Sequence, residues 1–190
     1  MNRDLQNFND LVEIFNSLPG LGKKSALRLA HHITVDDKFK GARMAHVIEK
    51  AVTSVKVCDE CGGITEHEIC DICSDGSRDG SKLCIVESAK DISFLESIKS
   101  YNGYYFVLQN DVQLEIEKIK SIAKDRDVKE IIFAFAPSIA SDGLIIYIED
   151  SLSMLEIEFT KIAQGIPGGI SLENIDIFSL SRAMEKRVKI

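Results

Sequence analysis

The sequence lacks any long apolar run and any apolar leader at its start. A helix needs about 20 consecutive, mostly apolar residues to cross a membrane, and no stretch of this chain approaches that length. The first seven residues, MNRDLQN, lack the apolar core of a signal peptide. We therefore expect a cytoplasmic chain with no membrane partner. With 190 residues that are 45% hydrophobic and 28% charged, it can bury one core of ordinary size.

The chain also lacks the overall positive charge that is typical of proteins that bind nucleic acids. Its formal net charge is −7, but residues 1–57 carry nine Lys/Arg and only six Asp/Glu, whereas residues 58–190 carry a net charge of −10. This asymmetry favours a phosphate-binding surface in the first segment and a surface for a basic partner protein in the second. Ordinary surface composition would give the same figures, so charge alone does not decide between these interpretations.

Cysteine is scarce, and four of the five cysteines stand in one pattern. Two C-x2-C pairs, eight residues apart, are formed by Cys58, Cys61, Cys70 and Cys73. Two such turns can place four thiolates about 2.3 Å from a common centre, which is the tetrahedral geometry of a structural zinc site. The alternative is disulfides or unpaired thiols, but two such pairs in a chain without an export signal favour metal. His67, between the pairs, is a competing ligand that a full set of thiolates makes unnecessary.

Such a site is closed, and this limits what the zinc can do. All four positions are taken by protein, so no position is left for a bound water, and we expect a structural ion, one per chain. The loop between the pairs carries Glu66, His67 and Glu68 but no lysine, arginine or aromatic residue. It is therefore a poor candidate for binding nucleic acid, and we expect it to join two unlike parts of the chain.

A glycine-rich, basic turn lies between two expected helices near the start of the chain. Apolar residues at helical spacing predict a helix over residues 4–16, helix formers follow over 25–33, and a third helix is expected over 41–56. The turn reads Leu18-Pro-Gly-Leu-Gly-Lys-Lys24. Its glycines allow close backbone approach to a phosphate, the next helix presents its N-terminus, and the adjacent side chains add charge. The candidate DNA-binding residues are Gly20, Gly22, Lys23, Lys24 and Arg28.

Contacts of this kind reach the phosphate backbone, so they would not read the DNA sequence. A plain helix-turn-helix connection with solvated lysines is the alternative interpretation of this turn.

The pattern changes after the turn-rich residues 74–81. Short apolar runs predict strands over 82–87, 104–108, 130–135 and 155–162, and helices are expected over 91–100, 111–124 and 142–152. This alternation is typical of an α/β domain with a mostly parallel sheet covered on both faces. Cys84 lies inside the first strand, so we expect a core thiol and not a fifth ligand.

Two carboxylates stand where chemistry is expected in such a sheet. Ligands bind at the carboxyl ends of the strands, and Glu87 follows the first strand while Asp142 begins the helix after the third. Metal-dependent cleavage or synthesis of DNA usually needs a larger acid set than this pair provides. We therefore expect a docking surface for a basic partner and no catalytic residues. Unrelated solvated or capping carboxylates are the alternative.

Four motifs together resemble the RecR recombination mediator family, and the resemblance covers essentially the whole chain. They are the helix-hairpin-helix from Leu18 to Ala30, the four-cysteine motif, a toprim-like opening at Cys84-Ile-Val-Glu-Ser88, and a tail with IAQGIPGG at 162–169 followed by Leu172-Glu173 and Ser179 to Ala183. The resemblance implies a helical helix-hairpin-helix domain over 1–56, a zinc finger over 57–74, a toprim domain over 81–167 and a tail or oligomerisation segment over 168–190.

The resemblance also implies a role and partners. It implies a ring-like homo-oligomer, a dimer or tetramer, that binds DNA and acts with RecO and/or RecF to load RecA on single strands during recombinational repair. It makes RecO the expected partner of Glu87 and Asp142.

The chain departs from the family pattern at three places. The loop usual after the second toprim strand is missing at Leu108-Gln-Asn-Asp111, and Ala140-Ser-Asp142 keeps one acid of a Glu-Gly-Glu. In the tail, Ile170 stands where a glycine is usual. These departures bear on partner contacts more than on the fold.

Two other function classes fit parts of the sequence. A toprim-type, Mg²⁺-dependent nuclease or primase-like enzyme is favoured only by Glu87 and Asp142 on an α/β sheet. The other is a zinc-stapled adaptor that binds only proteins, which a salt titration of DNA binding would test.

Overall fold

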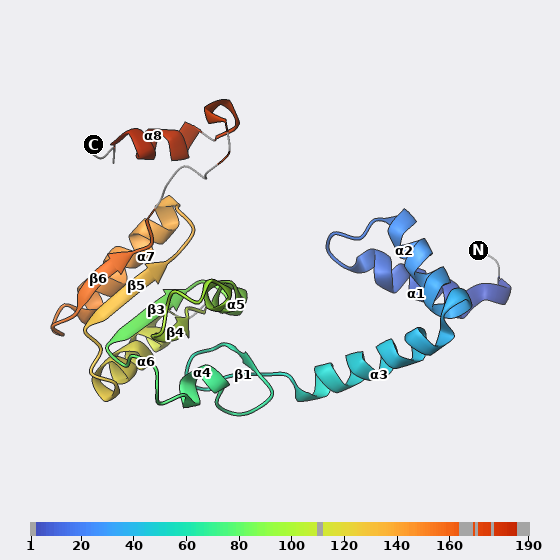
Figure 1. Cartoon of the computed structure of the whole chain (residues 1–190), viewed down its shortest axis with the longest axis horizontal. Coiled ribbons are helices and arrows are strands. Elements are labelled where there is room, and N and C mark those ends of the chain that lie inside the picture. The colour runs from blue at the N-terminus through green and yellow to red at the C-terminus, as the bar shows by residue number, and fades with distance from the viewer. Residues whose placement is uncertain (1–2, 110–111, 164–168, 170, 176, 186–190) are drawn as a thin grey trace. The chain divides into compact units, whose positions relative to one another are not determined.

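The computed structural model describes residues 3–109, 112–163, 169, 171–175 and 177–185. The chain divides into two compact units, Met1–Val55 and Lys56–Ile190, which are drawn in Figure 1 and described separately below. Among the described helices, none is long and apolar enough to span a membrane.

The regular elements described in the first unit are all helical. A short turn of 3-10 helix, Arg3–Leu5, leads into α1 (Gln6–Ser17), which is followed by α2 (Lys23–His31), a π-helical turn over His32–Asp36, and α3 (Lys38–Ser54). Helices α1 and α2 pack together because their apolar residues recur at helical spacing. Phe15, Ala26 and Ala30 form the buried centre, and partly buried side chains surround it: Phe8, Leu11, Val12 and Ile33. The three expected helices are confirmed within a few residues of their bounds.

The second unit begins with a small cysteine-rich module. Its secondary structure consists of β1 (Lys56–Val57), paired antiparallel with β2 (Ile64–Thr65), and the short helix α4 (Asp71–Ser74). With so little regular structure, the module depends on its cysteine cluster for a core.

A four-stranded parallel sheet forms the rest of this unit. The strands are β3 (Lys82–Val86), β4 (Tyr104–Val107), β5 (Glu130–Ala134) and β6 (Glu158–Lys161), in the order β4-β3-β5-β6. Ile85 of the inner strand β3 lies level with Phe106 of β4 and with Phe133 of β5. The connecting helices are α5 (Ala89–Ile98), α6 (Val112–Asp125) and α7 (Ile139–Leu152). The parallel sheet predicted from continuous apolar runs is confirmed.

Alternate residues of the strands pack into two cores on opposite faces, as the strand period requires. Leu83 and Ile85 pack with residues of α6 and α7, including Ile119 and Ile148. On the other face, Cys84, Val86 and Tyr105 pack with Ile92 of α5, which is drawn beside the sheet in Figure 1. Cys84 is only 4% exposed and burial raises the pKa of its thiol to about 12, so the prediction of a core thiol is confirmed.

A 3-10 turn (Leu172–Asn174) and helix α8 (Ile177–Glu185) end the described chain. The glycine-rich part of the tail motif, residues 164–168, and Asn110-Asp111 at the missing toprim loop lie outside the described residues.

Candidate metal centre and nucleic-acid interface

The four cysteines of the two C-x2-C pairs converge on one point. Their sulfur atoms all lie within 4.8 Å of one another, and all four residues are buried. The Sγ atoms of Cys61 and Cys70, from different pairs, are 3.6 Å apart. Four sulfurs at about 2.3 Å from a tetrahedral zinc would be about 3.8 Å apart, so the observed spacing fits a Zn²⁺ ion. In the part of the chain that the structure describes, this is the only cluster of metal-ligating side chains.

Backbone turns hold each cysteine of the cluster in place. The amide of Gly62 donates to the carbonyl of Cys58 at 3.0 Å, and Gly62 has a φ of +73°, which a residue with a Cβ adopts only with strain. The amides of Gly63 and Cys70 donate to the Sγ atoms of Cys61 and Cys58 at 3.3 Å each. Such N–H groups stabilise negative sulfur, as a thiolate ligand set requires.

The electrostatics of the cluster also suit a cation. A hydrogen bond from Cys73 lowers the pKa of Cys61 to about 6, and the same contact, with burial, raises the pKa of Cys73 far above its usual range. Burial raises the pKa of Cys70 to about 11. Once one cysteine is ionised, its negative charge disfavours ionisation of the neighbouring thiols. A divalent cation at the centre offsets the repulsion between the thiolates. The four residues fit one structural Zn²⁺, with no position left for a substrate.

The cysteine module packs against the α/β sheet of its own unit. The amide of Val107 in the edge strand β4 donates to the carbonyl of Cys61 at 2.8 Å. The first cysteine turn thus supplies a hydrogen-bond acceptor to the exposed edge of the sheet. A Cβ added to Gly62 would lie 3.1 Å from the Cβ of Val107, which shows how closely the two segments approach. The sequence predicts a connecting role for this module, and its contacts with the sheet make it a continuous part of the α/β unit.

A single arginine just after α6 makes a second link between the module and the sheet. Arg126 donates to Glu60 Oε2 at 2.6 Å and to the backbone carbonyl of Cys73 at 3.4 Å. Its guanidinium carbon also lies 3.7 Å from the centre of the Tyr104 ring in β4. One side chain thus contacts both cysteine turns and the edge strand. Sequence reasoning missed it, because Arg126 and Glu60 are 66 residues apart and no local pattern relates them.

The basic turn of the first unit has the geometry expected of a phosphate site. The Leu21 amide donates to the Leu18 carbonyl at 3.2 Å, and Gly20 has a φ of +81°, so the chain reverses sharply before α2. Space is open around Gly20 and Gly22, since a Cβ at either would meet no atom within 4 Å. Gly22 offers no capping side chain, and α2 has no acidic residue in its first turn. The helix N-terminus therefore presents backbone amides to an incoming anion.

Three positive side chains surround this helix end. Lys23 and Lys24 begin α2, and Arg28 follows one turn after Lys24; all three are exposed. Within the described part of the chain none of the three has an ion-pair partner. Six other lysines are each paired with an acid: Lys40, Lys82, Lys118, Lys120, Lys129 and Lys161. The charges beside the turn are therefore available to an external anion.

Glu87 and Asp142 lie at the expected end of the sheet but already have partners within the chain. Glu87 Oε2 accepts from the amide of Ala136, in the loop after β5, at 3.1 Å. Asp142 Oδ1 contacts Lys161 Nζ of β6 at 3.4 Å. Neither belongs to a metal-ligating cluster among the described residues. Both keep exposed surface, but their interaction with a partner remains a prediction.

A partly buried ion pair between Arg78 and Glu96 of α5 was also invisible in the sequence. Arg78 donates to Glu96 Oε2 and to the carbonyl of Gly103, the latter at 2.7 Å. Glu96 Oε1 and Tyr105 Oη are buried and form no hydrogen bond of ordinary geometry, although their contact affects the pKa of both groups. Burial alone would raise the pKa of Glu96, but the contacts from Arg78 and Tyr105 outweigh it and hold the pKa below its usual value.

Family models match three consecutive parts of the chain. Residues 8–52 match the RecR helix-hairpin-helix model, residues 55–75 match the model of the RecR zinc finger domain with four cysteines, and residues 81–163 match the toprim domain model. The cysteine cluster and the parallel sheet lie in the last two segments.

Curated relatives match over nearly the whole length. A protein named Recombination protein RecR from Campylobacter jejuni (strain RM1221) is 49% identical over 190 residues, all of both chains. A protein of the same name from a Nitratiruptor species is 48% identical, again over all of both chains. One from Helicobacter pylori (strain G27) is 40% identical over 185 residues, which are 97% of this chain and 96% of the relative.

Proposed function

This chain belongs to the RecR family of recombination proteins, and we propose that it binds DNA without sequence preference and acts with RecO and/or RecF to load RecA on single-stranded DNA. RecR proteins are recombination mediators and not enzymes. The proposed role consists of a DNA contact, a partner contact and the loading of RecA in the cytoplasm.

The observation that carries the DNA proposal is the uncapped N-terminus of α2, with Lys23 and Lys24 in its first turn. Backbone amides, a helix dipole and two full charges all act on one anion there. The open space at Gly20 and Gly22 lets a phosphate reach the backbone. Because every contact is to phosphate, all DNA sequences should bind alike.

One such turn offers few phosphate contacts, so useful affinity needs several copies acting together. We therefore propose a ring-like homo-oligomer, a dimer or tetramer. Support comes from α3, none of whose residues is buried. Two of its apolar side chains, Phe39 and Val52, are 81% and 78% exposed. Apolar side chains at this level of exposure are typical of surfaces covered by another chain.

Glu87 and Asp142 are proposed as part of the surface for a basic partner, RecO in the first instance. Both stand at the carboxyl end of the sheet in the part of the chain that carries a net charge of −10. Glu87 accepts a hydrogen bond from the Ala136 amide. Asp142 forms an ion pair with Lys161 and has one or more other contacts within the chain. Both side chains also keep surface that a partner can reach. Rim carboxylates of this kind mainly speed encounter with a basic partner.

The experiment that tests the function measures DNA affinity as a function of salt together with Mg²⁺-dependent turnover on the same substrate. The proposal expects an affinity that falls steeply with salt, is equal for unrelated sequences, and is accompanied by no cleavage or synthesis. Mg²⁺-dependent turnover that disappears in Glu87→Gln would favour the toprim-type enzyme. Absence of salt-dependent DNA binding would favour the adaptor that binds only proteins.

A further inference from the structure

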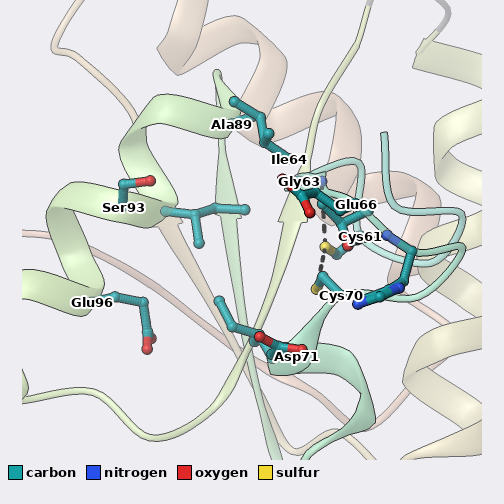
Figure 2. Close-up of a pocket in the computed structure, with 13 residues that line it drawn as sticks. Cys61, Gly63, Ile64, Glu66, Cys70, Asp71, Ala89, Ser93 and Glu96 are labelled. Carbon is teal, nitrogen blue, oxygen red and sulfur yellow. Dashed lines mark hydrogen bonds between the residues drawn. The ribbon is translucent and has the colours of Figure 1, made fainter. Parts of the chain in front are cut away.

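A pocket of about 400 Å³ lies between the cysteine module and α5. Figure 2 shows Ala89, Ser93 and Glu96 of α5 along one wall, with Cys61, Cys70 and Asp71 of the module across from them. The pocket belongs to one compact unit and is separate from the DNA-binding turn, which lies in the other. It also contains neither Glu87 nor Asp142.

The walls of this pocket combine apolar surface with negative charge. Ile64, Ile72 and Ile92 supply apolar surface, whereas Glu66 and Asp71 supply carboxylates from the module. Among the described residues, no lysine or arginine lines the pocket. An occupant must therefore be apolar over part of its length and positive at its end.

One wall of the pocket ends at the partly buried ion pair between Arg78 and Glu96. Glu96 lines the pocket, and its Oε2 is used by Arg78. Its Oε1 is buried against the hydroxyl of Tyr105, a side chain only 1% exposed. Arg78 and Tyr105 therefore hold the Glu96 carboxylate at this wall, and the exposed carboxylates that an occupant can reach are those of Glu66 and Asp71.

The negative charges exclude the other classes of ligand. A nucleic acid would bring phosphates against carboxylates of the same sign. A divalent cation needs ligand atoms that converge, and among the described residues only the four cysteines do so.

We propose that this pocket takes a lysine side chain from a protein partner, presented by a segment with apolar residues on both sides of the lysine. The four-carbon stem of lysine can lie along the isoleucines while its ammonium group, with three donors, reaches carboxylates that come from different elements. Arginine suits the site less, because its planar guanidinium group pairs best with a single carboxylate through two parallel hydrogen bonds, whereas the carboxylates of this pocket are separate.

The test uses the full-length chain labelled at isoleucine δ1-methyl groups and the peptide acetyl-Gly-Leu-Lys-Leu-Gly-amide as the probe. Titration followed by methyl NMR should shift the signals of Ile64, Ile72 and Ile92 and leave the core residue Ile131 in place. A matched peptide with norleucine in place of lysine should bind about tenfold more weakly, since it keeps the stem and loses the charge. Equal shifts from the two peptides, or no shifts at these three residues, would overturn the proposal.

Two variants show whether the lysine enters this pocket. Glu66→Gln combined with Asp71→Asn should abolish the preference for lysine over norleucine, whereas the control Glu117→Gln, at an exposed carboxylate of α6 outside the pocket, should keep it. Ser93→Leu lies on the opposite wall, remote from the cysteines in sequence, and should block both peptides by filling the pocket. Zinc content is measured for every variant, to show that the cysteine module is intact. A lysine preference that survives Glu66→Gln/Asp71→Asn, or binding that survives Ser93→Leu, contradicts the proposal.

Discussion

Arg126 stacks on Tyr104, with its guanidinium carbon 3.7 Å from the ring centre, and in this position it also donates to Glu60 at 2.6 Å. The aromatic ring thus orients the cation that ties the cysteine module to the sheet. A cation–π contact and a partly buried ion pair act on the same group, whose side chain is 23% exposed.

Replacement of Arg126 should loosen the module. We expect Arg126→Ala to lower the free energy of unfolding by about 1–2 kcal/mol and to speed zinc loss to a chelator, because the contacts to Glu60 and to the Cys73 carbonyl disappear together. Urea unfolding and a colorimetric zinc-release assay measure the two effects. Lys124→Ala, two residues earlier in the last turn of α6 and without an ion pair among the described residues, is the control. Unchanged zinc release in Arg126→Ala would contradict this role.

Gly62 should tolerate no side chain. Its φ of +73° and the 3.1 Å approach of an added Cβ to Val107 imply backbone strain and a tight contact for Gly62→Ala. We expect a loss of about 1–3 kcal/mol in the free energy of unfolding. The control is Gly76→Ala, where a Cβ would meet no atom within 4 Å. Equal stability of the two variants in thermal unfolding would show that the backbone approach is not constrained.

Loss of a zinc ligand should be distinguishable from loss of a cysteine as such. Cys58→Ser should release the ion and disorder the module, since metal binding and local folding share one free energy. Cys84→Ser removes the thiol of the core and should keep one zinc per chain. Elemental analysis of both purified variants gives the answer, and a full complement of zinc in Cys58→Ser would exclude the four-cysteine site.

The partly buried pair of Arg78 and Glu96 makes stability depend on pH in a definite direction. The pKa of Glu96 is below its usual value in the folded chain, so its contribution is present above the unfolded pKa and is lost as the pH falls through the folded pKa. Glu96→Gln should therefore be less stable than the wild type at pH 7, by about 1–3 kcal/mol, and the difference should shrink in acid below about pH 4.

Unfolding by urea at several pH values measures this dependence. The control is Glu117→Gln, whose parent side chain is 71% exposed beside Lys120 and should contribute little at any pH. A difference between wild type and Glu96→Gln that stays constant from about pH 7 to about pH 3 would argue against the ion pair.

Local patterns predict much of this molecule, and long-range contacts account for what they miss. Apolar runs and spacing predict the four strands of the sheet and its three connecting helices, because burial imposes the same period on sequence and structure. They do not predict the short elements β1, β2 and α4, or the helix α8. The zinc ligands follow from C-x2-C spacing, and the proposed phosphate site rests on Gly20 and the lysines beside it. Arg126 with Glu60, and Arg78 with Glu96, leave no such signal, since the fold alone brings them together.

Binding of DNA phosphates by α2 can be measured through the salt dependence of DNA affinity in Lys23→Ala/Arg28→Ala. We predict that binding of single-stranded DNA is abolished at physiological salt, with zinc content and oligomeric mass unchanged. At low salt the slope of log affinity against log salt should fall by about 0.7–0.9 for each phosphate interaction that the substitutions remove. Lys90→Ala/Lys124→Ala, which removes the same charge from the other unit, should bind like the wild type. DNA affinity in Lys23→Ala/Arg28→Ala equal to that of the wild type would show that α2 does not bind the DNA.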